Sequence, residues 1–201
     1  MRTRFAGLDI SFDERVLAPR QWTEVQSRWA ADLLPDLPDG DVLELCCGAG
    51  QIGLSAVAGS ARRLVAVDIN PVAAHYTTLN ARRARVPLAM RLGPMRRMLA
   101  SEERFPLILA DPPWVPTALT STFPDDPRVA IDGGRLGMAL VDQCLQIIED
   151  HLLPGGVAVL QLGPSGEQAR AVATRADVRE TRRYPRGTLV LIAQHRTAAT
   201  L

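Results

Sequence analysis

The chain has 201 residues, of which 47% are apolar and 22% are charged. This composition excludes a disordered chain and suits one domain with a full hydrophobic core. The 23 basic and 22 acidic residues give a net charge of +1, so the overall charge gives no signature of a nucleic-acid binder. Every basic side chain of this set is Arg, because the sequence contains no Lys. A catalytic lysine and a phosphate-binding lysine are therefore excluded.

The sequence shows no targeting signal. Its first residues, Met1 to Gly7, lack the apolar core of a signal peptide, and no stretch is long enough to span a membrane. The three cysteines, Cys46, Cys47 and Cys144, have neither metal-binding nor redox spacing. We expect a cytoplasmic protein with no metal site and no membrane partner.

The first forty residues are predicted to form a helical segment on the substrate side of the domain. A helix is expected over residues 23–34, preceded by an extended or turn segment over residues 13–20. Thr23 and Glu24 stand near the start of this helix, where they can cap it or reach a ligand, and capping is the simpler role. Residues 41–201 are predicted to form the cofactor-binding core of the same single domain.

A glycine-rich turn follows the first buried strand. Residues 41–46 read as a strand, residues 47–53 as the turn, and a helix then runs to about residue 57. Gly48 and Gly50 would let the backbone approach a ligand closely. A second strand, residues 64–67, ends at Asp68, which lies 20 residues after Gly48. This is the spacing at which a carboxylate binds the ribose hydroxyls of an adenosyl ligand, but Gly48-x-Gly50-x-x-Gly53 also fits a dinucleotide site.

The remaining chain alternates helices with strands. We predict the helices at residues 70–85, 138–153 and 167–175, and the strands at residues 87–92, 105–110, 157–162, 178–184 and 188–194. This order predicts an α/β fold with a mostly parallel sheet of about seven strands, helices on both faces and an antiparallel C-terminal hairpin. His151 and His195 lie at element ends, where a structural role is expected.

The strand at residues 105–110 leads into Asp111-Pro112-Pro113-Trp114. Two prolines remove two backbone donors and hold their carbonyls in fixed directions beside the Asp111 carboxylate. Such acceptors, next to a flat indole, suit a planar amino group, whose N–H protons they would accept. A proline-rich loop with a buried Trp is the alternative reading. Residues 115–137 then form a long loop, which we interpret as a lid or substrate rim rather than a disordered insertion.

Three ordered motifs carry a resemblance to known proteins. They are similar to the motifs of class I S-adenosylmethionine-dependent methyltransferases, and more narrowly to the HemK/PrmC family of protein-glutamine N5-methyltransferases, in the stretches Glu44–Gly50, Val67–Pro71 and Asp111–Trp114. The resemblance implies a Rossmann-like fold and S-adenosylmethionine as cofactor. The implied cofactor-binding residues are Thr23, Glu44, Cys46, Gly48, Gly50, Asp68, Ile69 and Asp111, and the implied catalytic residues are Asp111, Pro112 and Trp114.

Further stretches resemble the same family, and three features depart from it. The supporting stretches are Leu17–Glu24, Asp126–Gly137 and Leu153–Gly156. The family usually has Asn and Tyr at the positions of Asp111 and Trp114, and the Asp-Pro-Pro-Trp form resembles that of exocyclic-amine DNA methyltransferases. Bacterial members carry a helical release-factor-binding domain that forty residues cannot hold, and some shorter members of the wider family work with a partner subunit. Gly93–Met95 stands where many methyltransferases place an acid near the adenine.

The leading prediction is an enzyme that methylates a planar nitrogen, either a glutamine amide of a protein or an exocyclic amine. Asp111 and the Pro112 carbonyl would accept the two N–H bonds of that nitrogen and aim its lone pair at the methyl group. A small metabolite, a natural product, RNA or DNA are alternative acceptors. A nicotinamide-dependent oxidoreductase and a catalytically silent subunit that binds a partner are the less favoured functions.

Overall fold

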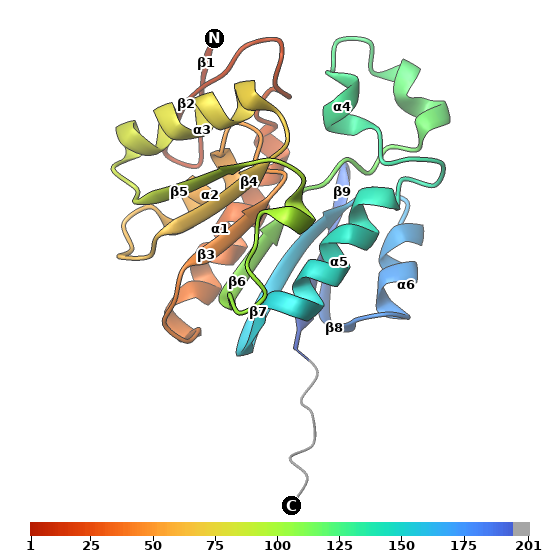
Figure 1. The fold of residues 1–201 in the computed structure, drawn as a ribbon. Coiled ribbons are helices and arrows are strands. Elements are labelled where there is room, and N and C mark those ends of the chain that lie inside the picture. The colour runs from red at the N-terminus through yellow and green to blue at the C-terminus, as the bar shows by residue number, and fades with distance from the viewer. Residues whose placement is uncertain (195–201) are drawn as a thin grey trace, which may run out of the picture.

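A seven-stranded sheet forms the centre of the computed structural model, which describes residues 1–194 (Figure 1). Its strands are β3 (Val42–Leu45), β4 (Leu64–Asp68), β5 (Leu88–Leu92), β6 (Phe105–Ala110), β7 (Leu152–Leu162), β8 (Asp177–Tyr184) and β9 (Gly187–Ala193). They lie in the order β5-β4-β3-β6-β7-β9-β8, in which β3 to β7 are parallel and β9 is antiparallel to both of its neighbours. The predicted fold class, including the antiparallel C-terminal hairpin, is confirmed.

Helices cover both faces of this sheet. The helices α1 (Glu24–Leu33), α2 (Gln51–Val57) and α3 (Pro71–Ala84) pack on one face, and α5 (Ala139–His151) and α6 (Glu167–Ala173) pack on the other (Figure 1). Alternate strand residues therefore enter two separate cores, as Val42 and Leu43 of β3 show. Because both faces are buried there, β6 is a continuous apolar run, and β4 is one up to its last residue, Asp68.

Shorter elements connect these layers. They are the strands β1 (Arg2–Phe5) and β2 (Leu8–Ser11), the helix α4 (Arg128–Ile131), and the 3-10 helices η1 (Gln21–Thr23), η2 (Leu34–Asp36), η3 (Met95–Arg97) and η4 (Thr117–Thr122). The β1–β2 hairpin was not predicted, because its two strands are only four residues long. Phe5 and Ile10 from this hairpin are buried in the same core as α1 and α2. The N-terminal segment thus shares its core with the sheet.

The segment between residues 115 and 137 is folded back on itself. The Val115 N–H donates to the Ile131 carbonyl at 3.0 Å, and the Gly133 N–H donates to the Val115 carbonyl at 2.8 Å. Arg20, just ahead of α1, forms an ion pair with Asp126 of this segment. The interpretation as a disordered insertion is therefore wrong, whereas a role as a lid stays a prediction.

The start of strand β7 and the positions of two histidines can also be compared with the predictions. Strand β7 begins at Leu152, five residues earlier than the sequence predicts, and a register shift in its pairing with β6 accommodates the Pro154-Gly155-Gly156 stretch. His195 lies outside the described residues, whereas His151 ends α5 as expected. Within residues 1–194, no helix has the length and apolar character needed to cross a membrane.

The strand order reverses between β3 and β6. From β3 the chain proceeds outward to β4 and β5, and then returns to β6 on the other side of β3. Connections leave these two strands in opposite directions, so a crevice forms at their carboxyl ends, which is where open α/β sheets bind ligands.

Candidate active site

A cavity of about 620 Å³ lies at this reversal point, a volume within the usual range for sites that bind small molecules and cofactors. The loops after β3, β4, β5 and β6 form its walls, together with part of the N-terminal segment and the helices α4 and α5. Its lining includes Val16, Leu17, Cys46, Gly48, Gln51, Asp68, Ile69, Gly93, Pro94, Met95, Asp111, Pro113, Arg128 and Gln143.

The turn after β3 has a backbone conformation that favours glycine. Gly48 and Gly50 have φ angles of +56° and +78°, and Cys46 also adopts a left-handed conformation, with φ of +57°. Gly50 is closely packed as well, because a Cβ there would lie 2.9 Å from the Thr77 methyl group. The turn brings the Gly48 backbone to the cavity wall while α2 begins directly behind it.

Asp68 ends β4 with its carboxyl group held by the backbone. One oxygen accepts the Gly48 N–H at 2.8 Å, and the other accepts the Asn70 N–H at 2.8 Å. Burial raises the pKa of this carboxyl, and the backbone hydrogen bonds oppose the rise. Each oxygen has a second acceptor position, so the carboxylate can also accept hydrogen bonds from a ligand in the cavity.

Glu44 of β3 lies below the glycine turn and does not line the cavity. Its Oε1 accepts the Gly53 N–H at 2.9 Å, and a Cβ on Gly53 would lie 2.4 Å from Oε2. The residue is only 2% exposed, and burial raises the pKa of its carboxyl to about 8. Burial thus favours the uncharged form of Glu44, and its contact with the Gly53 N–H supports the first turn of α2.

Asp111 lies at the end of β6 and lines the cavity together with Pro113. Burial raises the pKa of the Asp111 carboxyl to about 7, and a hydrogen bond with the Trp114 side chain lowers it only in part. The Trp114 carbonyl accepts a hydrogen bond from Gln168 at 2.9 Å. Among residues 1–194, no hydrogen bond reaches the Pro112 carbonyl.

Five of the predicted site residues meet around the cavity, namely Cys46, Gly48, Asp68, Ile69 and Asp111. Gly50, Glu44, Pro112 and Trp114 do not belong to the cavity lining. Thr23 is separate from the cavity lining, since its buried hydroxyl donates to the Arg20 carbonyl at 2.8 Å. It makes no side-chain cap hydrogen bond to α1, so the predicted capping role is wrong.

The lining also includes residues that were not predicted as site residues, among them Val16, Leu17, Gln51 and Arg128. Gln51 is the first residue of α2, and its buried Oε1 has no hydrogen-bond partner among the described residues. Its position inside the glycine motif was the only available signal. Val16 lies outside the motifs, and Arg128 lies in the Asp126–Gly137 stretch, whose resemblance to the family does not indicate a contact with the cavity.

Family comparison identifies the type of site. The family model "Methyltransferase small domain" matches residues 24–123. A protein named "Putative protein N5-glutamine methyltransferase MJ0928", from Methanocaldococcus jannaschii, is 30% identical over 136 residues, which cover 67% of this chain and 68% of that protein. A release factor glutamine methyltransferase from Moorella thermoacetica is 33% identical over 183 residues, or 86% of this chain. The chain spans only 63% of the latter relative's length.

The fold has close counterparts among solved structures. A methyltransferase from Pyrococcus furiosus aligns with a TM-score of 0.66 and 20% identity, covering 94% of this chain and 90% of that one. At this level of identity the likeness concerns the fold alone, and it agrees with the Rossmann-like sheet order described above.

The cavity fits S-adenosylmethionine, the cofactor of the family. The spare acceptor positions of Asp68 suit ribose hydroxyls, and the unpartnered Oε1 of Gln51 suits a polar N–H group. The side chain of Ile69 is 60% exposed at the rim and offers an apolar surface to the adenine ring. With the ordered motifs, the sheet order and the two relatives all in agreement, the chain belongs to the HemK/PrmC family of class I S-adenosylmethionine-dependent methyltransferases.

Proposed function

We propose that the protein transfers a methyl group to the side-chain amide nitrogen of a glutamine in a protein acceptor. The observation that supports it most is the pairing of Asp111, at the cavity wall, with an adjacent Pro112 carbonyl to which no described residue donates. These are two acceptors on adjacent residues, and a primary amide presents two N–H donors. Glutamine methylation is the activity in the names of the two relatives above.

The proposed mechanism depends on alignment and on charge. An amide nitrogen is a poor nucleophile because its lone pair is delocalised into the carbonyl group. Asp111 and the Pro112 carbonyl would accept its two N–H bonds, which orients the lone pair and increases the electron density on nitrogen. Both interactions strengthen as positive charge develops on that nitrogen, so they stabilise the transition state more than the ground state. S-adenosylmethionine supplies the methyl group from its sulfonium centre.

The reaction also releases a proton. As the new N–C bond forms and the C–S bond breaks, the nitrogen must lose one of its two protons. The raised pKa of Asp111, about 7, makes its carboxylate a suitable acceptor for that proton at neutral pH. Asp68 and the Gly48 backbone would hold the cofactor during this step.

A second acceptor class is supported by the identity of residue 111. The Asp-Pro-Pro-Trp form resembles that of methyltransferases acting on exocyclic amines of bases, which are planar nitrogens with two N–H bonds as well. The net charge of +1 gives no general attraction to a polyanion. We therefore place a nucleic-acid base second to a glutamine amide.

We also make proposals about the cellular location of the protein and about a partner subunit. We propose a cytoplasmic location, supported by Cys46, Cys47 and Cys144, which are all free thiols. A partner subunit that helps to bind the acceptor stays a prediction.

Mass spectrometry would test the proposed acceptor. The protein is incubated with S-adenosylmethionine carrying a deuterated methyl group and, in parallel, with a release factor, a single-stranded oligonucleotide and a set of small amines. We expect the label on one glutamine of the release factor, and no label when Asp111→Ala replaces the native protein. Label on a base amine or on a small amine, with none on glutamine, would overturn the proposal.

A further inference from the structure

We propose that Gln168, the second residue of α6, is a positioning residue that holds the Asp111–Trp114 segment in place for methyl transfer. This inference deepens the proposed function and rests on it for its kinetic consequence. Gln168 does not line the cavity, and no sequence motif drew attention to it. Gln168 would affect the reaction indirectly, by holding Trp114 in place.

The Gln168 side chain makes hydrogen bonds with both ends of its amide. Its Nε2 donates to the Trp114 carbonyl at 2.9 Å and to the Gly137 carbonyl at 3.0 Å. Its Oε1 accepts the Gly163 N–H at 2.8 Å. The two Nε2 protons and the Oε1 are therefore all engaged, and the residue is only 9% exposed.

These partners come from three segments that lie far apart in the sequence. Trp114 follows β6, Gly137 closes the segment of residues 115–137, and Gly163 follows β7. A fourth, longer contact of 3.4 Å reaches the Leu136 carbonyl. One amide thus connects the Asp111–Trp114 segment with the end of the segment of residues 115–137 and with the end of β7.

Glycines make the close approach of these segments possible. A Cβ on Gly137 would lie 2.1 Å from the Trp114 carbonyl oxygen, and one on Gly133 would lie 2.6 Å from the Pro113 carbonyl oxygen. A Cβ on Gly163 would lie 3.1 Å from Cε3 of the Trp114 ring, so the indole rests against the end of β7. The main chain and ring of Trp114 are therefore packed against three glycines, Gly133, Gly137 and Gly163.

Asp111 is connected to this arrangement through the chain itself. Asp111 and Trp114 are the two ends of one four-residue segment that two prolines stiffen, and the Trp114 ring rests on Gly163, whose N–H is bound by Gln168. Without the Gln168 amide, the Trp114 and Gly137 carbonyls would lose their donor in a buried place. The segment would then relax, and with it the position of Asp111 and the Pro112 carbonyl.

The first test compares Gln168→Met, which keeps the side chain's length but removes its amide, with the matched control Gln146→Met. Gln146 is a surface glutamine of α5 whose amide contacts only Asp150. We expect Gln168→Met to lower kcat at least tenfold, because a small displacement of reacting groups is costly. The dissociation constant for S-adenosylmethionine should stay within twofold, and the control should match the native protein in both quantities.

The second test replaces the Nε2 donor alone. Gln168→Glu keeps an acceptor for the Gly163 N–H, but as a carboxylate it presents an oxygen to the Trp114 and Gly137 carbonyls. A protonated carboxyl can donate to one of them again, so the ratio of variant to native kcat should rise as the pH falls. A general loss of packing would lower both Gln168 variants equally at every pH.

The third test needs no methyl acceptor. Hydrogen exchange of the native protein and Gln168→Met is compared, and we expect the Gly163 N–H and residues 133–139 to exchange at least tenfold faster in the variant. If the native protein methylates no glutamine, the proposed function fails while this test still decides on Gln168. The inference would be overturned if hydrogen exchange in these segments were unchanged in Gln168→Met. It would also be overturned if the kcat of this variant equalled that of the native protein.

Discussion

At the scale of single residues, two neighbouring carboxyl groups differ in what they can do. Asp68 is held by two backbone N–H groups, whereas the buried Asp111 has a pKa of about 7. Asp68 is thus suited to bind a polar ligand, and Asp111 is suited to accept a proton near neutral pH.

Replacement of Asp111 by Asn should change the pH dependence of the reaction. Below about pH 7 the native carboxyl is protonated and loses one of its acceptor oxygens, so kcat/KM at low cofactor concentration should rise with pH through about 7. In Asp111→Asn, which cannot titrate, kcat/KM should be independent of pH over the same range, and at pH 8 it should lie about 10–1000-fold below the native value. A variant that kept the native pH profile would show that another group titrates.

The sequence predicted single residues well where a motif supplied them. Asp68 and Asp111 were placed correctly at strand ends, because a buried apolar run followed by an acid marks the edge of a parallel sheet. Gln168 could not be predicted, since it contacts Trp114 from a distant segment, and the stretch that contains Arg128 gave no sign of its contact with the cavity. Thr23 was misplaced because its hydroxyl prefers a local backbone carbonyl.

At the scale of elements, the join between β3 and α2 determines the shape of the cofactor loop. Gly53 lies in the first turn of α2 directly above Glu44, which occupies the space that a side chain would need. The close contact between Gly53 and the buried Glu44 carboxyl therefore fixes the position of α2 relative to β3.

Gly53→Ala should therefore destabilise the protein by about 1–3 kcal/mol, because overpacking of a buried contact forces the backbone to move. Cofactor affinity should fall as well, since α2 begins at the cavity wall. Urea denaturation measures the first effect, and Ser55→Ala on the same helix is the control. Ser55 Oγ has no hydrogen-bond partner within residues 1–194, so its removal should cost less than about 0.5 kcal/mol. Equal stability of Gly53→Ala and Ser55→Ala would contradict the packing argument.

The elements of the core were predicted within a few residues, because each combines an apolar run with a clear start or stop. Helix α3 begins at Pro71 behind the Asn70 side chain, which accepts the Val72 N–H at 2.9 Å. The β1–β2 hairpin and α4 gave no such signal. Short elements are stabilised by tertiary contacts, which a local pattern does not contain.

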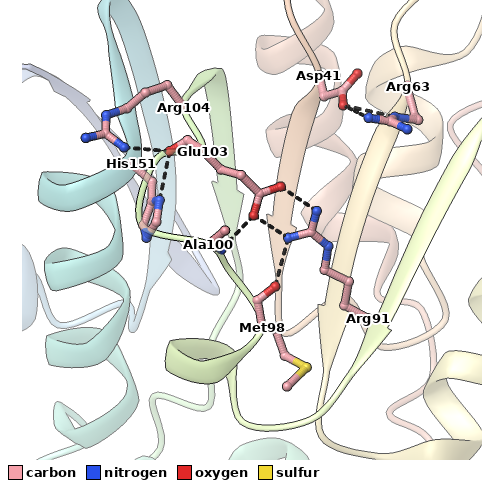
Figure 2. Close-up of polar contacts among 8 residues, drawn as sticks. All are labelled: Asp41, Arg63, Arg91, Met98, Ala100, Glu103, Arg104 and His151. Atoms are coloured by element: carbon pink, nitrogen blue, oxygen red, sulfur yellow. Dashed lines mark hydrogen bonds and ion pairs between the residues drawn. The ribbon is translucent and has the colours of Figure 1, made fainter.

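At the scale of the whole molecule, a polar cluster joins β5 to the chain that enters β6 (Figure 2). Arg91 donates two hydrogen bonds to the Glu103 carboxylate, at 2.7 and 2.5 Å, and the Ala100 N–H donates a third at 2.8 Å. His151 and Arg104 contact the Glu103 carbonyl, so the cluster also reaches the end of α5. The Arg91 hydrogen bonds, the main cause, lower the pKa of Glu103 to about 2.

This cluster should make the fold sensitive to acid. A carboxyl whose folded-state pKa is lowered stabilises the fold above its ordinary pKa of about 4.5, and this stabilisation is lost as the pH falls towards about 2. Glu103→Gln should therefore lower the free energy of unfolding by about 1–3 kcal/mol at pH 7 and have little effect at pH 2. Denaturation at both pH values measures this, with the exposed neighbour Glu102→Gln as control. An equal loss for Glu103→Gln at both pH values would contradict the ion-pair explanation.

The central claim is that the cavity between β3 and β6 binds S-adenosylmethionine through Asp68. Calorimetric titration of the native protein and Asp68→Ala with S-adenosylmethionine, S-adenosylhomocysteine and NAD tests it most directly. We expect micromolar binding of the first two and none of NAD, with affinities at least tenfold weaker in Asp68→Ala, because hydrogen bonds to a charged group contribute about 1.5–3 kcal/mol. Native affinity in Asp68→Ala, or binding of NAD in place of S-adenosylmethionine, would contradict the account.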